Sequence, residues 1–181
     1  MYIRIFLWLY LILFCTRGIH AQGCQVKKVD QYKFDELAVL CNINGVKEVI
    51  NQLSTSKKCL VYLSNQATAY HLKIIVINFN DSGRAVNGTE SHWDTRDSSL
   101  ETRKIKGKSI QKVCRNVSYE KLWKTYLACL GVTSHNSYEI IQVKTNGQKT
   151  GGYISNGTEK DFSQPELSLF ADLLEYLRRI K

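Results

Sequence analysis

Proline, catalytic signature motifs and long apolar segments are scarce in this chain of 181 residues. Pro165 is its only proline, which excludes proline-rich spacers and polyproline recognition. The sequence contains no Gly-x-Ser-x-Gly elbow, no His-Glu-x-x-His pair and no phosphate-binding glycine loop. It also lacks Cys-x-x-Cys, so neither a thioredoxin-type motif nor a zinc knuckle is expected. We therefore predict a protein that is not an enzyme and that uses no cofactor or metal.

The one long apolar run lies at the N-terminus. Arg4 supplies a positively charged N-terminal region, and Ile5–Cys15 is an uninterrupted apolar run. Ile19–Ala21, which ends in a small residue, fits a signal-peptidase cleavage site. This is the pattern of a secretory signal peptide over residues 1–21. The run is shorter than the roughly 20 residues that a transmembrane helix needs. We expect a single secreted, extracellular domain over residues 22–181, with no membrane span.

The charge of the mature chain is positive. The 25 basic residues fall to 23 once Arg4 and Arg17 of the leader are removed, against 16 acidic residues. Such a balance favours acidic partners, such as sulfated glycosaminoglycans or acidic proteins. Alternatively, it only maintains solubility. Nucleic acid is not expected as a partner, because the protein is exported and has no aromatic-interleaved binding motif.

Five of the six cysteines remain after removal of the leader, and in an oxidising compartment most of them should pair. Five allow at most two bridges. We favour the near pairs Cys41–Cys59 and Cys114–Cys129, with Cys24 unpaired near the terminus. A bridge that closes a loop of about 15 residues contributes about 3 kcal/mol in the chain-entropy model.

Four Asn-x-Ser/Thr sequons indicate a glycoprotein and mark surface sites. An ordinary polar turn is the alternative interpretation of any one of them. The asparagines are Asn80, Asn87, Asn116 and Asn156.

Hydrophobic periodicity predicts an α+β domain that is stabilised by disulfides, with an antiparallel sheet, a central helix and a C-terminal helix. Whether the sheet closes into a barrel stays open. Residues 34–43 alternate as a strand, although a helix is a second interpretation, and residues 84–102 are predicted as a long exposed loop. The other expected elements are helices at Val46–Leu53 and Tyr119–Leu130, strands at Cys59–Leu63, Leu72–Phe79, Lys104–Val113 and Tyr138–Lys144, a type I′ hairpin at Asn146-Gly147, and a C-terminal helix after the capping box Ser163-Gln164-Pro165-Glu166.

A basic segment is the sharpest candidate for binding. Residues 102–107, Thr-Arg-Lys-Ile-Lys-Gly, have the spacing associated with heparin recognition. In a strand, alternate lysines would share one side at intervals of about 7 Å. The alternative is a solvated sheet face, or lysines that protect an edge strand. The candidate polyanion-binding residues are Arg103, Lys104, Lys106, Lys108 and Lys112.

Aromatic residues offer one interface candidate. Trp93 lies in the predicted polar loop, where it is either an exposed interface anchor or folded back onto the domain. Trp123 and Tyr126 are expected in the core, on the central helix. His92 and Asp94 beside Trp93 are only two potential metal ligands, fewer than the three or four that a site needs.

The cysteine order and local texture carry one resemblance. Cys24, the segment Cys41-Asn-Ile-Asn-Gly, the segment starting at Cys59-Leu-Val-Tyr-Leu, and Cys114 followed by Trp123-Lys-Thr-Tyr-Leu-Ala-Cys129 resemble the salivary immunosuppressant glycoproteins of ticks. The resemblance implies a saliva protein that dampens lymphocyte or cytokine responses of the host. It carries no binding residues over to this sequence.

These observations lead to one functional hypothesis and two alternatives. The hypothesis is a secreted, N-glycosylated protein that modulates host immunity by binding a host or extracellular protein. One alternative is a lipocalin-like carrier of a small apolar ligand. The other is a secreted protein that binds glycosaminoglycans through Arg103 to Lys112.

Overall fold

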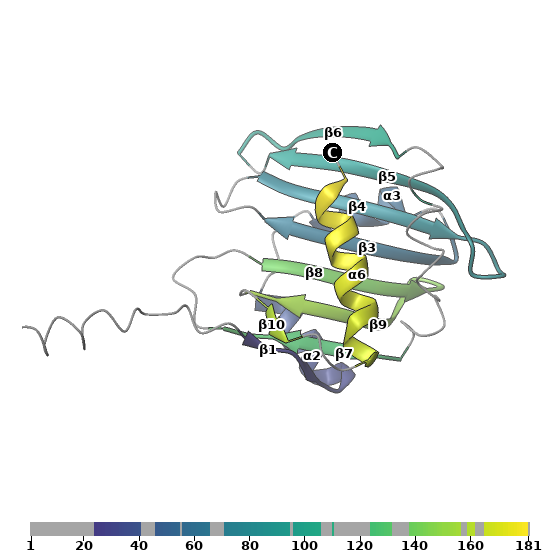
Figure 1. Cartoon of the computed structure of the whole chain (residues 1–181). Coiled ribbons are helices and arrows are strands. Elements are labelled where there is room, and N and C mark those ends of the chain that lie inside the picture. The colour runs from purple at the N-terminus through teal and green to yellow at the C-terminus, as the bar shows by residue number, and fades with distance from the viewer. Residues whose placement is uncertain are drawn as a thin grey trace, which may run out of the picture.

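A computed structural model describes residues 24–40, 46–54, 56–65, 71–94, 96–105, 110, 124–131, 138–156, 159–161 and 165–180. Together they form an α+β fold built on one large sheet (Figure 1). None of the described helices is long and apolar enough to cross a membrane. The elements are β1 (Cys24–Gln25), β2 (Lys27–Lys28), α2 (Gln31–Leu40), α3 (Val46–Leu53), β3 (Lys58–Asn65), β4 (His71–Phe79), β5 (Ala85–Asp94), β6 (Ser99–Lys104), β7 (Tyr126–Cys129), β8 (Tyr138–Thr145), β9 (Gln148–Ser155), β10 (Glu159–Asp161) and α6 (Pro165–Arg179).

The large sheet has eight strands in the order β2-β7-β9-β8-β3-β4-β5-β6. Neighbours are antiparallel except β7 and β9, which run parallel. β1 and β10 form a separate parallel pair. The large sheet is open, with β2 and β6 at its two ends. It is therefore not the closed barrel that a lipocalin-like carrier requires.

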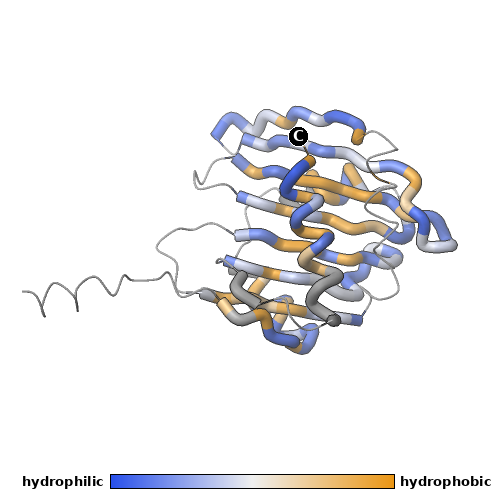
Figure 2. Tube along the Cα trace, viewed as in Figure 1, coloured by the Kyte–Doolittle hydropathy of each residue, from blue (hydrophilic) through white to orange (hydrophobic). Residues whose placement is uncertain are grey.

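Helices cover both faces of this sheet. α6 crosses one face, whereas α2 and α3 lie on the other (Figure 1). Strands buried on both faces become apolar throughout rather than alternating. β3 and β4 show this pattern, and Figure 2 shows apolar residues concentrated on the central strands. The prediction that Leu72–Phe79 is a central strand is confirmed.

The packing of α6 follows from its apolar stripe. Phe170, Leu173, Leu174 and Leu177 recur at helical spacing and are each at most 1% exposed. The ring of Phe170 lies 6.0 Å from the ring of Tyr153 on β9. The C-terminal helix predicted from the sequence is thus confirmed, and it anchors one layer of the core.

The opposite face depends on a close approach between α2 and β9. A Cβ atom at Gly152 would lie 2.5 Å from Cζ of Phe34 and 2.6 Å from the carbonyl oxygen of Ile141. The Phe34 ring also contacts Tyr126, at 5.3 Å between centroids. Only glycine allows Phe34 to lie this close to the sheet.

The predicted type I′ hairpin is confirmed between β8 and β9. Asn146 and Gly147 both have positive φ, at 51° and 78°, as that turn requires. The predicted helix Val46–Leu53 is confirmed as α3, and Tyr138–Lys144 is confirmed as part of β8. These elements have strong local signals.

Two predictions on the N-terminal and middle segments are wrong. Residues 34–40 belong to helix α2 and are not a strand, because Asp30 caps the helix by accepting a hydrogen bond from the Lys33 amide at 2.7 Å. Residues 84–102 are not a loop, since β5 and β6 form a hairpin there. Asp94 stabilises its turn by accepting from the backbone and side chain of Arg96, hydrogen bonds that lower the pKa of the Asp94 carboxyl.

Two further predictions fail in the following segments. The strand expected at Lys104–Val113 is wrong at the positions that the structure describes, because β6 ends at Lys104 and Ile110 is helical. Residues 106–109 and 111–113 lie outside the described residues. The helix expected at Tyr119–Leu130 is wrong at its C-terminal end, where Tyr126–Cys129 form β7 between β2 and β9. Sheet pairing there overrides the helical spacing of the apolar residues.

The cysteine pairing also differs from the prediction. Cys24 bonds to Cys129, with Cα atoms 5.2 Å apart, so Cys24 is not the unpaired cysteine. β2 pairs antiparallel with β7 and brings the two residues together from 105 positions apart. Cys59 is a free thiol on the opposite face, where burial raises its pKa. Cys41 and Cys114 lie outside the described residues.

We expect removal of this bridge to destabilise the fold strongly. Cys24→Ser combined with Cys129→Ser should lower the free energy of unfolding by about 2–5 kcal/mol in urea titrations, because the bond closes a long loop in the unfolded chain. Cys59→Ala is the control, and its non-reduced peptide map should retain the Cys24–Cys129 peptide. A map that links Cys24 to any other cysteine would contradict the prediction.

Candidate functional site

Glu90 is the one ionisable side chain among the buried polar residues that the structure describes. Glu90 on β5 is 1% exposed and faces the side of the sheet that α6 covers. The register places it between Ile75 on β4 and Arg103 on β6. One step along, His92 lies opposite Lys73 on β4. The β-strand period of two therefore brings these side chains to one face from three strands.

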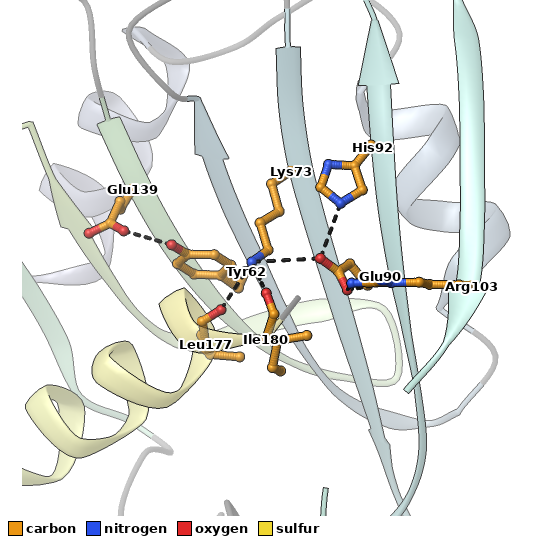
Figure 3. A network of polar contacts seen from close by, with 8 residues as sticks. All are labelled: Tyr62, Lys73, Glu90, His92, Arg103, Glu139, Leu177 and Ile180. Atoms are coloured by element: carbon orange, nitrogen blue, oxygen red, sulfur yellow. Dashed lines mark hydrogen bonds and ion pairs between the residues drawn. The ribbon is translucent and has the colours of Figure 1, made fainter. Parts of the chain in front are cut away.

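Three basic side chains surround Glu90 (Figure 3). Arg103 donates from Nε and Nη2 to Oε2, at 2.8 and 2.5 Å. His92 Nε2 lies 3.1 Å from Oε1, and Lys73 Nζ lies 3.6 Å from the same oxygen. A buried carboxylate needs such partners, because an unpaired charge out of water is costly. We call Lys73, Glu90, His92 and Arg103 the Glu90 cluster.

The Glu90 cluster reaches the C-terminus of α6 through Lys73. The lysine Nζ donates to the carbonyl oxygen of Ile180 at 2.5 Å and to that of Leu177 at 3.4 Å. Leu177 is in the last turn of α6 and Ile180 follows its last residue, where helical partners are missing and the helix dipole is negative. Burial lowers the pKa of Lys73, and the nearby Glu90 opposes this effect. Lys73 thus ties the helix end to the sheet.

A second polar chain lies beside the first. The Tyr62 hydroxyl donates to Glu139 Oε1 at 2.6 Å, and Arg178 of α6 donates from Nε to the same carboxylate at 2.9 and 3.0 Å. Burial, and next the charge of Glu139, raise the pKa of Tyr62. Figure 3 shows Tyr62 and Glu139 on one side of the Lys73 ammonium group and Glu90 on the other.

This arrangement suits anchoring better than chemistry. The Glu90 carboxylate is already paired with Arg103, His92 and Lys73. The Lys73 ammonium group is also bonded to the carbonyl oxygens of Leu177 and Ile180. Among the residues that the structure describes, no three His, Cys, Asp or Glu side chains gather into a group that could hold a metal. The Glu90 cluster joins β4, β5 and β6, and its Lys73 links them to the end of α6.

The predicted interface residue lies elsewhere than expected. Trp93 is 6% exposed, lies opposite Leu72 on β4, and belongs to the core on the α2 and α3 side. It cannot act as an exposed anchor, because its strand turns it inward. Tyr126 is buried as predicted, although in a strand. Trp123 lies outside the described residues.

Of the five predicted polyanion-binding residues, the structure describes Arg103 and Lys104, which are the last two residues of β6. Arg103 faces α6 and bonds Glu90, whereas its neighbour Lys104 is directed to the other face. β6 ends at Lys104. Lys106, Lys108 and Lys112 lie outside the described residues.

Three of the four sequon asparagines are described. Asn80 and Asn87 are exposed near the β4–β5 turn, and Asn156 is half-buried after β9. In each, the recorded side-chain hydrogen bonds use Oδ1, which accepts from Arg84, Asn78 or Gly131. A glycan is attached through Nδ2, so these contacts are compatible with its attachment. Asn116 lies outside the described residues.

Sequence reasoning missed the Glu90 cluster. Glu90 and His92 lie in the stretch 84–102 that the composition predicts as a loop, and Arg103 belongs to the segment that is predicted to bind polyanions. The recoverable signal was the alternation of Glu90 and His92 with the buried Ser91 and Trp93. Lys73 gave no such signal, because its partners lie 107 and 104 positions away at the end of α6.

Comparison with known proteins adds no relative. No family model, no curated protein and no solved structure matches this chain. The functional argument therefore depends on the chain's own residues.

We expect Glu90→Gln to destabilise the protein by about 3 kcal/mol, because the amide leaves the buried Lys73 without its countercharge. Glu101→Gln on the exposed strand β6 is the matched control, with a change within about 0.5 kcal/mol. Urea unfolding with fluorescence detection measures both at low protein concentration. Equal losses in the two variants would contradict the anchoring role.

Tyr62 should make stability fall at high pH. The folded state keeps its phenol protonated, whereas the unfolded state releases the proton above the ordinary pKa of 10.0. The contribution of Tyr62 is therefore fully present below pH 10 and is lost above it, by up to about 1.4 kcal/mol per pH unit. Tyr62→Phe should show a shallower decline when urea unfolding is measured from pH 9 to pH 11. Parallel declines in the two proteins would contradict this assignment.

Proposed function

We propose that this protein is a secreted, N-glycosylated binding protein that suppresses lymphocyte or cytokine activity of a host by contact with another protein. The observation that carries the proposal is the bond between Cys24 and Cys129. Such bonds persist in oxidising compartments and are rare in the cytosol. The leader pattern over residues 1–21 agrees with this route.

The sequon positions give a second line of support. Asn80 and Asn87 are exposed and flank the turn that joins β4 to β5. Glycans on these asparagines would cover the β4–β5 turn. A protein partner would then find more open surface along β6 and around α6 than at the β4–β5 turn.

The immune part of the proposal comes from the sequence. The cysteine order resembles that of tick salivary immunosuppressant glycoproteins, and the chain lacks the motifs of hydrolases and nucleotide-binding enzymes. We infer action by binding and not by catalysis. A host immune protein is the partner class that this resemblance implies.

The test begins with expression of the full chain in insect cells. We expect the protein in the medium, with residues 1–21 removed and a mass that falls on enzymatic removal of N-glycans. Protein that stays in the cytosol with free thiols and bare asparagines would overturn the proposal at its first step.

The second step measures activity on host lymphocytes. The purified glycoprotein should lower stimulated proliferation and cytokine release in a dose-dependent way. The control is Cys24→Ser with Cys129→Ser, which should lose the effect as it loses stability. A correctly secreted and glycosylated protein that changes neither readout would contradict the immune function while leaving secretion intact.

A further inference from the structure

β6 is the outer strand at one end of the eight-stranded sheet (Figure 1). Its inner side pairs with β5, and no strand among the described residues pairs with its outer side. All residues of Ser99–Lys104 are exposed, including Leu100 at 37%. An unpaired strand edge is a template for another strand.

The backbone directions along β6 follow from one hydrogen bond. The Ile105 amide donates to the Gly88 carbonyl oxygen at 2.9 Å, and these two residues continue the antiparallel register. Successive residues of a strand direct their backbone groups to opposite sides. Arg103 and Glu101 therefore bond toward β5, whereas the amides and carbonyls of Leu100, Thr102 and Lys104 point outward.

These directions restrict how a second copy of β6 could pair with the first. Outward residues must oppose outward residues, so an antiparallel pair is centred on Glu101, Thr102 or Arg103. A centre at Glu101 or at Arg103 sets like charges directly opposite each other, which is destabilising. A centre at Thr102 sets Glu101 opposite Arg103 of the second copy, and it does so twice.

The side chains fit this register. Arg103 uses Nε and Nη2 for Glu90, and its Nη1 has no partner in the part of the chain that the structure describes. Nη1 can therefore bond Glu101 of the second copy. Leu100 would lie opposite Lys104 of the second copy, whose aliphatic stem can cover it.

The edge strand at the other end of the sheet, β2, is a poorer site for pairing with a second copy. β2 comprises only Lys27 and Lys28, both exposed, and short lysine-bearing edges resist strand addition. Pairing of β6 with itself is isologous and closes at two copies. We propose that this chain forms a symmetric dimer in which the two β6 strands pair antiparallel about Thr102, with about six backbone hydrogen bonds between them.

The first test is sedimentation velocity of the secreted protein from micromolar to millimolar concentration at low salt. The wild type should shift from monomer to dimer with concentration, and the dimer should weaken as salt is added. Glu101→Lys should raise the dissociation constant about tenfold or more, because both opposite-charge pairs become like-charge pairs. Glu36→Lys on the exposed side of α2 makes the same charge change and should leave the constant unaltered.

The second test is a proline at the centre of the pair. Thr102→Pro removes an outward amide and spares the backbone hydrogen bonds to β5, as proline tolerates edge strands. It also removes the side-chain hydrogen bond between Thr102 Oγ1 and Ser91 Oγ on β5. The variant should keep its circular dichroism spectrum and remain monomeric. A dimer that survives both Glu101→Lys and Thr102→Pro would overturn the proposal, since it would use another surface.

Amide hydrogen exchange distinguishes a second copy of β6 from another part of the same chain as the segment that covers the outer side of β6. The Leu100, Thr102 and Lys104 amides should exchange freely at dilution and become protected as the dimer forms. Protection at concentrations where only monomer exists would show that another part of the chain covers β6. That result, or a wild type that stays monomeric up to millimolar concentration, would overturn the dimer.

Discussion

Burial of the central strands on both faces is the constraint on which the rest of this structure depends. A sheet with apolar side chains above and below must be covered twice, by α6 on one side and by α2 with α3 on the other. Both layers need close contact to the strands. Gly152 provides it for α2, and the stripe from Phe170 to Leu177 provides it for α6.

The same constraint explains where the polar groups gather. The apolar stripe of α6 ends at Leu177, and beyond it the sheet carries Lys73, Glu90 and Glu139. These charged groups are held by one another and by the last turn of the helix. These polar contacts lie where α6 ceases to cover the sheet, and they fix the position of its C-terminal end relative to the strands.

The parts of the fold with strong local signals could be predicted from the sequence. β4 contains the uninterrupted apolar run Ile74–Ile77, Asn146-Gly147 has one favoured turn, and α6 has regular spacing. β5 and β6 were missed because Glu90 and Ser91 are polar yet buried, so composition alone resembles a loop. The apolar spacing around Tyr126–Cys129 predicts a helix, because four apolar residues suit either a helix or a strand until their neighbours in the sheet are known.

The site was less predictable than the fold, because its contacts are long-range. Tyr62 and Glu139 are 77 positions apart, and Cys24 and Cys129 are 105 apart. Cysteines that are close in the sequence need not pair, because the order of strands in the sheet decides which cysteines lie side by side. Sequons could be found because their signal is three residues long.

The strand order also has a consequence for biosynthesis. β7 joins the body of the sheet only through β9, which follows it in the chain. On the proposed secretory route, Cys24 would enter the oxidising lumen long before β9, the strand that holds β7 and its Cys129 in the sheet. A disulfide isomerase would be needed to undo early mismatched bonds, so the yield of correctly oxidised molecules should be governed by how late in translation β9 is completed.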